Sequence, residues 1–591
     1  MRRLHIIFIK HKTFILDRLK HLFLLLVLIN TQFSRAQQTI TLDETVYVHS
    51  NATSFVTGET LLYKVYCLKS SDKTPSNISK IAYVEIVDNN HKSVFKTKIA
   101  LENGVGQGDY FIPTTVKTGN YKLVGYTNWM LNKPISELFQ LDINIINPYK
   151  TDEKTNAEKV LTSSTKSNAS ENLKNDNITL NLNKKSFTNR ELVDLKIQSS
   201  NADFKNGNYS LSVRKLDNIP SSDKISAVGF ASNPSYPIAL DTQKQDQKLV
   251  LPELRGEIIA GTISAKNGTD KIANISVGLS IPGKSFAFKV VKTDMYGNFI
   301  FNVGQTYYTS NIILQIIDEK ASGYNLVVNN SPEIDYSKLS FEKNTSLSYT
   351  FKESLLERSV SSQVENAYFY KKVDNIEKAP TTDAFYYPLA KEYVLDDYTR
   401  FKTLKETITE VVVEIYSKQK DNNLYLHVTD PNVFPQLPES ALVLVDGEYL
   451  ENVNDLALYS MKNVYKVELI IGRYYIGPRS FNGLISFTTF NKDFKNTQTG
   501  SFIAKPTVLR PQPKKIYNKV KYESGSDNDR IPDFRNQLLW NPNAQLNSDA
   551  DTSFYTSDLS GTFEIRLEGF TKNGIPVSVT ENIEVQNTAV N

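Results

Sequence analysis

Apolar and polar residues alternate along much of this chain, and short turns rich in Asn, Asp and Gly separate the alternating stretches. A period of two predicts β-strands that bury one face. The pattern is clear in VYVHSNATSFVTGETLLYKVYCL, where Gly58 and Glu59 form a turn, and in GNYKLVGYTNWMLN at Gly119–Asn132. It returns in ITLNLNKKSFTNRELVDLKIQSS at Ile178–Ser200 and in YSLSVRKL at Tyr209–Leu216. We therefore expect β-sandwiches over the first part of the chain.

The stretch from Leu251 to Val303 shows three strands separated by two turns. Asp294 and Gly297 close a hairpin before Phe299 and Phe301. The period then changes in ESLLERSVSSQVENAYFY at Glu353–Tyr370. Here apolar residues recur at mostly three- and four-residue steps, which predicts one amphipathic helix packed on its neighbours, with a protein-binding face as the alternative. Its apolar positions are Leu355, Leu356, Val360, Val364 and Ala367.

A different order of elements follows after Leu395. Val443–Gly447 predicts a buried strand that ends in an Asp-Gly turn, and Asn454–Met461 predicts a short helix. Val464–Ile471 and Leu484–Phe490 predict two further strands, so the region has a βαββ order. Alternation resumes over the last hundred residues, which predicts a final β-sandwich.

Two segments differ in composition from the strands around them. Residues 151–176 are polar with almost no large apolar side chains, so we expect a linker or a long surface loop. Residues 1–36 combine a basic stretch, the apolar run Leu22–Ile29 and the small residues Ser34 and Ala36. This is typical of a secretory signal peptide cleaved after Ala36, with a retained anchor as the alternative. No apolar run in the chain reaches the roughly 20 residues needed to span a bilayer.

The composition supports a mainly β fold, since aromatic residues make up 11% of the chain and Tyr and Phe number 32 and 30. We expect tandem immunoglobulin-like β-sandwiches, one small α+β domain and a connecting helix. The expected order is a signal peptide (1–36), a first sandwich (37–150), a polar linker (151–176), a second sandwich (177–250), a third sandwich (251–330), a helical connector (331–405), the α+β domain (406–500) and a C-terminal sandwich (501–591).

Charge and cysteine content exclude two classes of protein, nucleic-acid-binding proteins and disulfide-stabilised proteins. Loss of the leader removes seven Lys and Arg against one Asp, which takes the formal charge from +4 to about −2. No basic stripe with interleaved aromatics remains, so we expect no nucleic-acid partner. The single cysteine, Cys67, rules out a disulfide framework, and its apolar neighbours predict a buried strand residue.

A search for catalytic chemistry gives no positive sign. His49, His91 and His427 stand alone after the leader, with no partner at metal-ligand spacing. No phosphate loop, dinucleotide fingerprint or nucleophile elbow is present. Asp527, Asp529 and Asp533 lack the spacing of a calcium loop, so a solvated loop is the simpler interpretation. We expect a non-enzyme with no cofactor, no metal and no catalytic residues.

Residues 441–490 resemble the second half of the plug domain of TonB-dependent outer-membrane receptors. The resemblance rests on the Asp446-Gly447 turn, Val467-Glu468-Leu469, Gly477 and Asn482-Gly483. Such a receptor needs a barrel of roughly 22 strands after its plug, and only about a hundred residues follow here. We therefore expect a plug-like domain without the transporter. Glu410-Val411-Val412-Val413 resembles the acidic-then-valine run that an energising partner engages by strand addition, and a simple edge strand explains it equally well.

The other domains carry weaker resemblances. Residues 37–150, and less clearly 177–250, resemble the macroglobulin MG2-type sandwich, and the C-terminal sandwich resembles later domains of bacterial macroglobulin-like proteins. Residues 251–303 resemble the carboxypeptidase-regulatory-like sandwich, which carries no peptidase residues. Cys67 is followed by Leu-Lys-Ser, so the thioester of true macroglobulins is missing.

Together these resemblances imply an exported, non-catalytic scaffold of a Bacteroidota-type envelope, located in the periplasm or at the outer membrane. We expect an accessory subunit of an outer-membrane transport or assembly complex, with a β-barrel or another envelope protein as partner and with peripheral membrane association. The alternatives are a binding protein for glycans or peptides, and a protease-interacting macroglobulin relative. The expected partner-binding loop is Gly472–Gly483, with Arg473, Tyr474, Tyr475 and Arg479.

Overall fold

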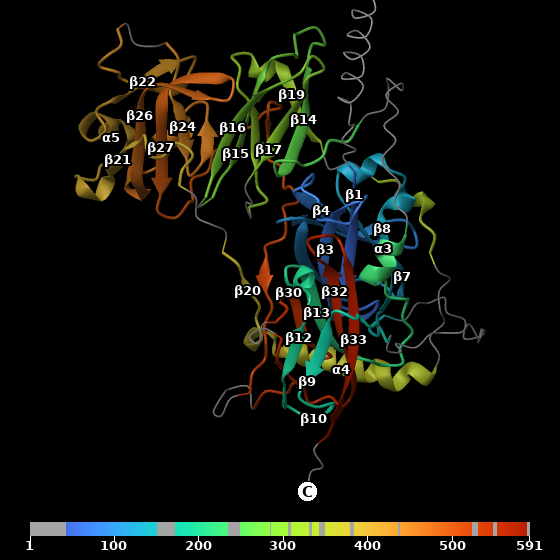
Figure 1. Ribbon diagram of the computed structural model, residues 1–591. Helices are drawn as coiled ribbons and strands as arrows, with labels where there is room; N and C mark the ends of the chain where they lie inside the picture. The colour runs from blue at the N-terminus through green and yellow to red at the C-terminus, as the bar shows by residue number, and fades with distance from the viewer. Residues whose placement is uncertain are drawn as a thin grey trace, which may run out of the picture. The chain divides into compact units, whose positions relative to one another are not determined.

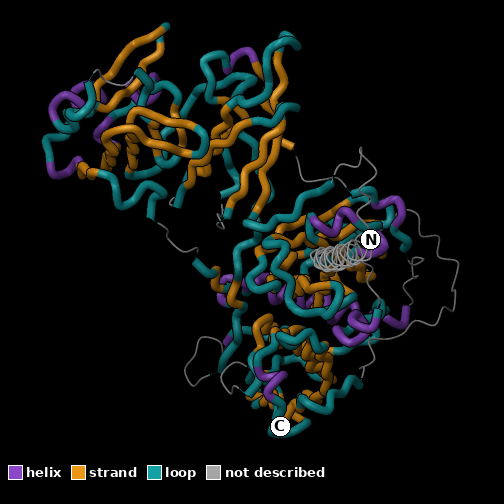
Figure 2. The backbone as a smooth tube through the Cα atoms, turned by 45° about the horizontal axis from the view of Figure 1, so that its top comes forward, coloured by secondary structure: helices purple, strands orange, loops and turns teal. Residues whose placement is uncertain are grey.

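The computed structural model describes residues 43–587 apart from 151–171, 234–248, 284, 305–308, 330–333, 342–348, 379–382, 435–437, 523–529 and 548–551. The expected signal peptide and most of the expected linker lie outside the described residues. Strands dominate the described chain, with few helices between them (Figure 2). The expectation of a mainly β fold is therefore confirmed.

The first sandwich is built from consecutive strands of residues 44–146. One sheet has the order β1-β3-β6 and the other the order β2-β8-β7-β4-β5. Their bounds are β1 Glu44–Ser50, β2 Ser54–Val56, β3 Thr60–Lys69, β4 Ile81–Asp88, β5 Ser93–Ala100, β6 Val105–Phe111, β7 Gly119–Tyr126 and β8 Phe139–Ile146. Cys67 is fully buried in β3, as its apolar neighbours predicted. The expected turn at Gly58 is confirmed, since this residue has a φ of +96° between β2 and β3.

The second sandwich joins strands from two distant parts of the chain. Its main sheet has the order β10-β33-β32-β13-β30, and Ser212 of β13 lies opposite both Trp540 and Arg566. Figure 1 shows green β13 between red and orange strands from the end of the chain. The bounds are β9 Thr179–Leu182, β10 Ser186–Thr188, β11 Leu192–Val193, β12 Leu195–Gln198, β13 Asn208–Lys215, β30 Gln537–Ala544, β31 Phe554–Tyr555, β32 Gly561–Phe570 and β33 Pro576–Gln586.

This arrangement differs from the expected separate sandwiches at 177–250 and 501–591. Strands from the two ranges share one sheet and one apolar core, which includes Leu211, Val213, Ile565 and Leu567. Neither range supplies enough strands to cover its own apolar face, so each completes the other. Two short helices lie in the first part, α2 Ala202–Lys205 and α3 Ala227–Ser232.

The third sandwich packs the sheet β17-β14-β19 against the sheet β16-β15-β18-β28. The bounds are β14 Glu257–Ala265, β15 Ser276–Ile281, β16 Ala287–Lys292, β17 Asn298–Val303, β18 Ile313–Ile316, β19 Tyr324–Asn329 and β28 Ile503–Ala504. The hairpin expected at Asp294–Gly297 is confirmed, because Asp294 N–H donates to Asn298 O at 2.9 Å and Gly297 has a φ of +81°. Phe299 and Phe301 are buried in the core.

The α+β domain has one mixed sheet of order β21-β26-β27-β24-β25. The bounds are β21 Lys391–Val394, α5 Leu404–Glu410, β22 Ile415–Lys420, β23 Asn423–Val428, β24 Leu442–Val445, β25 Glu448–Leu450, α6 Asn454–Leu458, β26 Val464–Ile476 and β27 Arg479–Thr489. The expected βαββ order is present, with β24 parallel to β27 and β26 antiparallel to it. The last two strands are longer than expected and meet in a hairpin at Gly477 and Pro478.

The predicted connecting helix forms as α4 (Lys352–Ala367), but the face that it buries is not the predicted one. Its buried residues are Arg358, Ser359, Ser361 and Ser362. Arg358 donates to Glu59 Oε1 at 3.0 Å, to Asp217 Oδ2 at 3.2 Å and to the Ser54 carbonyl at 2.9 Å. The small serines allow close approach, since a Cβ at Gly58 would lie 2.6 Å from Ser362 Oγ. An ion pair and close backbone packing therefore orient this helix in place of an apolar stripe.

Residues 510–517 run along the first sandwich and cover one of its sheet edges. The Gln512 side chain donates to Asp109 O at 2.9 Å and accepts from Asp109 N–H at 3.2 Å, as a neighbouring strand would. Glu257 lies 2.6 Å from both Lys98 Nζ and Arg510 Nη1. A short strand, β29 (Lys515–Ile516), pairs here with β20 (Asn375–Ile376). An uncovered edge strand favours aggregation, so this cover protects the first sandwich.

Candidate functional site

The two faces of the sheet in the α+β domain have different surroundings. One face buries Val467, Leu469, Ile485 and Phe487 in a core shared with α5 and α6. The opposite face is apolar in one half, where Leu442, Leu444, Ile470 and Leu484 pack with Phe288 and Val290 of the third sandwich. Its other half carries polar side chains. The strand alternation that fills the core thus also places a polar surface beside a neighbouring domain.

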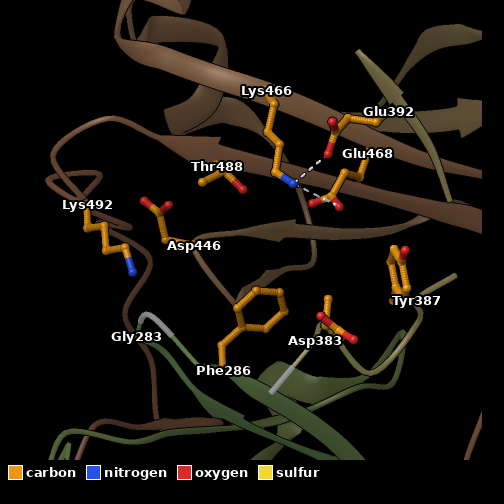
Figure 3. A pocket seen from close by; sticks show the side chains of 11 residues that line it. Gly283, Phe286, Asp383, Tyr387, Glu392, Asp446, Lys466, Glu468, Thr488 and Lys492 are labelled. Carbon is orange, nitrogen blue, oxygen red and sulfur yellow. Dashed lines mark hydrogen bonds and ion pairs between the residues drawn. The ribbon is translucent and has the colours of Figure 1, made fainter. Parts of the chain in front are cut away.

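A cleft of about 300 Å³ lies over this polar half (Figure 3). Strands β21, β26 and β27 and the end of β24 supply polar side chains. The opposite wall comes from Gly283 and Phe286 and from Asp383, Ala384 and Tyr387. The lining residues are Gly283, Phe286, Asp383, Ala384, Tyr387, Glu392, Asp446, Lys466, Glu468, Thr488 and Lys492.

An ion-paired lysine lies along one side of the cleft. Lys466 Nζ lies 2.7 Å from Glu392 Oε2 and 3.1 Å from Glu468 Oε1 (Figure 3). Glu468 also accepts a hydrogen bond from the Tyr386 hydroxyl at 2.9 Å. Burial lowers the pKa of Lys466, but the hydrogen bonds to Glu392 and Glu468 outweigh burial, so the pKa lies above its ordinary value. The lysine is therefore a fixed cation whose charge is already balanced.

The Asp446-Gly447 turn forms another side of the cleft. Asp446 and Gly447 have φ values of +49° and +87°, as a type I′ turn requires, so the predicted Asp-Gly turn is confirmed. Both carboxylate oxygens of Asp446 accept hydrogen bonds from Thr489, from N–H at 2.9 Å and from Oγ1 at 2.6 Å. Burial raises the pKa of Asp446 despite these hydrogen bonds. Its side chain therefore holds the turn through both carboxylate oxygens.

The four residues of the expected binding loop lie in the β26–β27 hairpin. Tyr475 is 69% exposed, and Arg473 lies at the surface, 3.9 Å from Glu439. Tyr474 is partly buried against the third sandwich, and Arg479 donates to Ile317 O at 2.7 Å. The hairpin therefore offers Arg473 and Tyr475 to solvent and uses Tyr474 and Arg479 to hold two domains together.

Glu410–Val413 does not form an extended segment. Glu410 ends α5, Val411 and Val412 are buried in the domain core, and Val413 is exposed. The segment is therefore not an edge strand, and two of its three valines are committed to packing. Strand addition at this segment would require that part of the core to open.

The outward face of α4 is a second exposed feature. Leu356 is 61% exposed and Val360 42% exposed, although both were expected to pack inward. Phe369 and Tyr370, just beyond the helix, are 57% and 68% exposed. The helix thus buries an arginine and serines while it leaves apolar side chains in water.

The isolated polar residues have structural surroundings. His49 is buried beside Ser210, His91 lies in a turn, and the ring of His427 stacks on Tyr416. Asp533 is buried against Arg535 at 2.6 Å and Lys372 at 3.3 Å, so the expectation of a solvated loop is wrong for this residue. Asp527 and Asp529 lie outside the described residues. Within the described residues, no group of three or more His, Cys, Asp or Glu side chains could hold a metal ion, and no helix is long and apolar enough to cross a membrane.

Most of the cleft residues were not foreseen from the sequence. Lys466 and Glu468 alternate with Val467 and Leu469, which predicts a polar face but not what covers it. The cover comes from Phe286 and Asp383, which precede these strands by a long stretch of chain. No local signal in the sequence joins them to the sheet.

No protein-family description and no curated protein sequence matches the chain. Among solved structures, it is similar to the native conformation of E. coli α2-macroglobulin, with 10% identity, a TM-score of 0.22, and coverage of 92% of this chain and 40% of that one. Salmonella α2-macroglobulin reacted with methylamine gives the same values. A β-glucosidase from Listeria innocua in complex with glucose has 12% identity, a TM-score of 0.12, and coverage of 17% of this chain and 16% of that one. The chain spans about 40% of the α2-macroglobulins, and TM-scores this low carry no argument about its function.

Proposed function

We propose that the chain is a non-catalytic binding scaffold of the cell envelope, which holds a protein partner on the outward face of α4. The observation that carries this proposal is the apolar surface that α4 leaves exposed, since only Leu355 and Val364 of its five apolar positions are even partly buried. Amphipathic helices normally bury their apolar face. A contiguous apolar patch that stays exposed marks a site of interaction with another molecule. Here Leu356 and Val360 are in water while Arg358 is buried.

The contacts of α4 explain how such a face would be held in place. Arg358 joins Glu59 of the first sandwich and Asp217, which follows β13 of the second. Lys215 pairs with Glu357, and Asn366 donates to Gly58 O at 2.9 Å. Because the helix is attached along its length, its outward face is ordered before a partner arrives, which lowers the entropy cost of binding.

The compartment and the partner follow from the sequence resemblances. An exported chain with a plug-like domain suits an accessory subunit of an outer-membrane transport or assembly complex. We infer a β-barrel or another envelope protein as the partner, and peripheral association with the membrane. Arg473 and Tyr475, on the surface of the β26–β27 hairpin, form a second contact region in this proposal.

The test is a mild-detergent purification of the tagged chain from its native outer membrane. We expect a partner in stoichiometric amount with the wild type, and its loss from a variant with Leu356→Gln and Val360→Gln. Glutamine retains helix propensity, and both positions are exposed, so stability should stay within about 0.5 kcal/mol. Leu458→Gln, at an exposed apolar position of α6 in the α+β domain, is the matched control and should retain the partner. A chain that purifies without a partner, or a double variant that retains it, would overturn the proposal.

A further inference from the structure

The cleft over the plug-like sheet has an excess of negative charge. Four carboxylates line it, from Asp383, Glu392, Asp446 and Glu468, against the two ammonium groups of Lys466 and Lys492. Figure 3 shows Lys466 between Glu392 and Glu468, and Lys492 on the Asp446 side. Since opposite charges attract more strongly near a low-dielectric wall than in water, such a cleft favours a cation over an anion.

The carboxylates differ in how fully they are engaged. Glu392 and Glu468 share Lys466, and both oxygens of Asp446 accept from Thr489. Asp383 is exposed, and it forms no hydrogen bond or ion pair with any other described residue. Asp383 is therefore the acceptor in the cleft that is available to a ligand.

Aromatic rings lie next to this carboxylate. The Phe286 ring stands at the centre of the cleft beside Asp383, with Tyr387 on the other side of Asp383 (Figure 3). Phe286 is fixed from behind, because its ring packs edge-on against Phe385 at 6.1 Å and beside Tyr386 at 6.2 Å. A cation within about 6 Å of such a ring face gains a further attraction.

The size of the cleft limits what it can bind. A volume of about 300 Å³ is at the lower end of the range for ligand pockets, so it suits one side chain or a small molecule. We propose that the cleft binds a single cationic side chain, arginine or lysine, carried by a polypeptide. Arginine fits best, because a planar guanidinium both pairs with a carboxylate through two hydrogen bonds and stacks on an aromatic ring.

This inference goes beyond the proposed function, since it does not require α4 to bind anything. The two can therefore fail separately. A partner that co-purifies equally with the wild type and with Asp383→Asn leaves the scaffold in place and removes the cleft from that contact. If the chain purifies without a partner but binds a basic peptide, the cleft proposal stands and the scaffold proposal fails.

The experiment titrates the full chain with a blocked tripeptide that carries arginine between two glycines, followed by ligand-observed NMR. The matched probe replaces arginine by citrulline, which has nearly the same shape and no charge. We expect saturable binding of the arginine peptide and none of the citrulline peptide. Asp383→Asn should raise the dissociation constant roughly tenfold, as for loss of a charged hydrogen-bond partner. Tyr387→Leu should raise it about threefold through loss of the aromatic ring.

Asp397→Asn is the control variant, because Asp397 is another exposed carboxylate of the same domain and does not line the cleft. It should bind the arginine peptide as the wild type does. Equal binding of the two peptides would show a site that does not select a cation, and equal weakening by Asp383→Asn and Asp397→Asn would show diffuse attraction to the domain. Either result, or no binding by the wild type, would overturn the proposal.

Discussion

Several charged side chains of this chain lie in its interior, each with partners from distant parts of the sequence. Arg358 joins Glu59 and Asp217, and Glu257 joins Lys98 and Arg510. Burial would raise the pKa of Glu59, but Arg358 and Arg214 outweigh it and lower that pKa. Removal of one member of a buried pair leaves the other uncompensated, at a cost of about 3–5 kcal/mol. These residues therefore fix how the sandwiches meet.

His49 is a buried titratable residue between the first two sandwiches. Its Nδ1 lies 2.6 Å from Ser210 Oγ, and its Nε2 has no hydrogen-bond partner. Burial lowers the pKa of His49 well below 6.5, and the cationic Arg566, Lys224 and Lys64 nearby lower it further. The folded chain therefore holds this imidazole neutral.

This position predicts a loss of stability in mild acid. Because the folded pKa of His49 lies below the unfolded value, the unfolded chain takes up the proton first as the pH falls below about 6.5. Between about pH 7.5 and pH 5.5, urea unfolding should show the wild type losing about 1 kcal/mol more than His49→Gln, which can keep the hydrogen bond to Ser210. The acidic groups that titrate in both proteins cancel in this difference. Parallel pH profiles for the two proteins would show that folding does not lower the pKa of His49.

At the scale of the single element, the sequence pattern predicted that α4 forms but not which of its faces is buried. The change of period predicted the helix, and it forms over Lys352–Ala367. The same pattern predicted an apolar buried face, yet the helix docks through Arg358 and three serines. The burial of Arg358 depends on Glu59 and Asp217, which come from other elements. The spacing of apolar residues indicates only which helix face is hydrophobic. It therefore cannot predict how a helix is oriented when ion pairs with distant residues determine its orientation.

The sequence predicted the strands of the α+β domain but not the cleft, because only the strands have a local signal. Val443–Val445 and Val467–Leu469 carry apolar residues for a core within the domain, and their alternation with an Asp-Gly turn is a local signal. The cleft needs Phe286 and Asp383 against Glu468, residues whose proximity depends on how two domains pack. That contact is a property of the folded chain and has no local pattern.

Gly447 in the Asp446-Gly447 turn serves both the α+β domain, through its positive φ, and the cleft, through its close contact with Phe286. Gly447 has a φ of +87°, and a Cβ there would lie 2.3 Å from Phe286 Cβ. Gly268 has a φ of +71° with no atom within 4 Å of its Cβ position. We expect Gly268→Ala to cost about 1 kcal/mol for backbone strain alone. Gly447→Ala should cost about 2–4 kcal/mol, because steric overlap adds to the strain. Thermal unfolding of the two variants side by side measures the difference, and equal losses would mean that Phe286 moves away freely.

At the scale of the whole molecule, the second sandwich contains strand pairing between distant segments that the sequence did not predict. Residues 179–215 and 537–586 each show clear strand alternation, and the sequence places them in two separate domains. In the structure β13 lies between β30 and β32, with Tyr209, Leu211 and Val213 buried in the shared core. Strand alternation says which face is buried but not which strand is the neighbour. The residues between them, which include the third sandwich and the α+β domain, are an insertion into this sandwich.

The insertion predicts that the second sandwich folds without the residues between its halves. Lys215 N–H donates to Asn536 O at 2.8 Å, so the end of β13 and the start of β30 are adjacent and antiparallel. An Asn-Gly pair can therefore replace residues 217–535, because with Leu216 it forms a three-residue loop between Lys215 and Asn536 and makes β13–β30 a hairpin. We expect the resulting chain of about 100 residues, 172–216 joined to 536–587, to unfold cooperatively in urea and to give dispersed amide NMR signals, since it retains a complete core. It should be less stable than the intact protein, because it loses the contacts of Ser210 with His49 and Tyr66. Residues 172–216 alone are the control and should remain unfolded. A collapsed fusion without cooperative unfolding would show that this sandwich requires the first sandwich or α4 to fold.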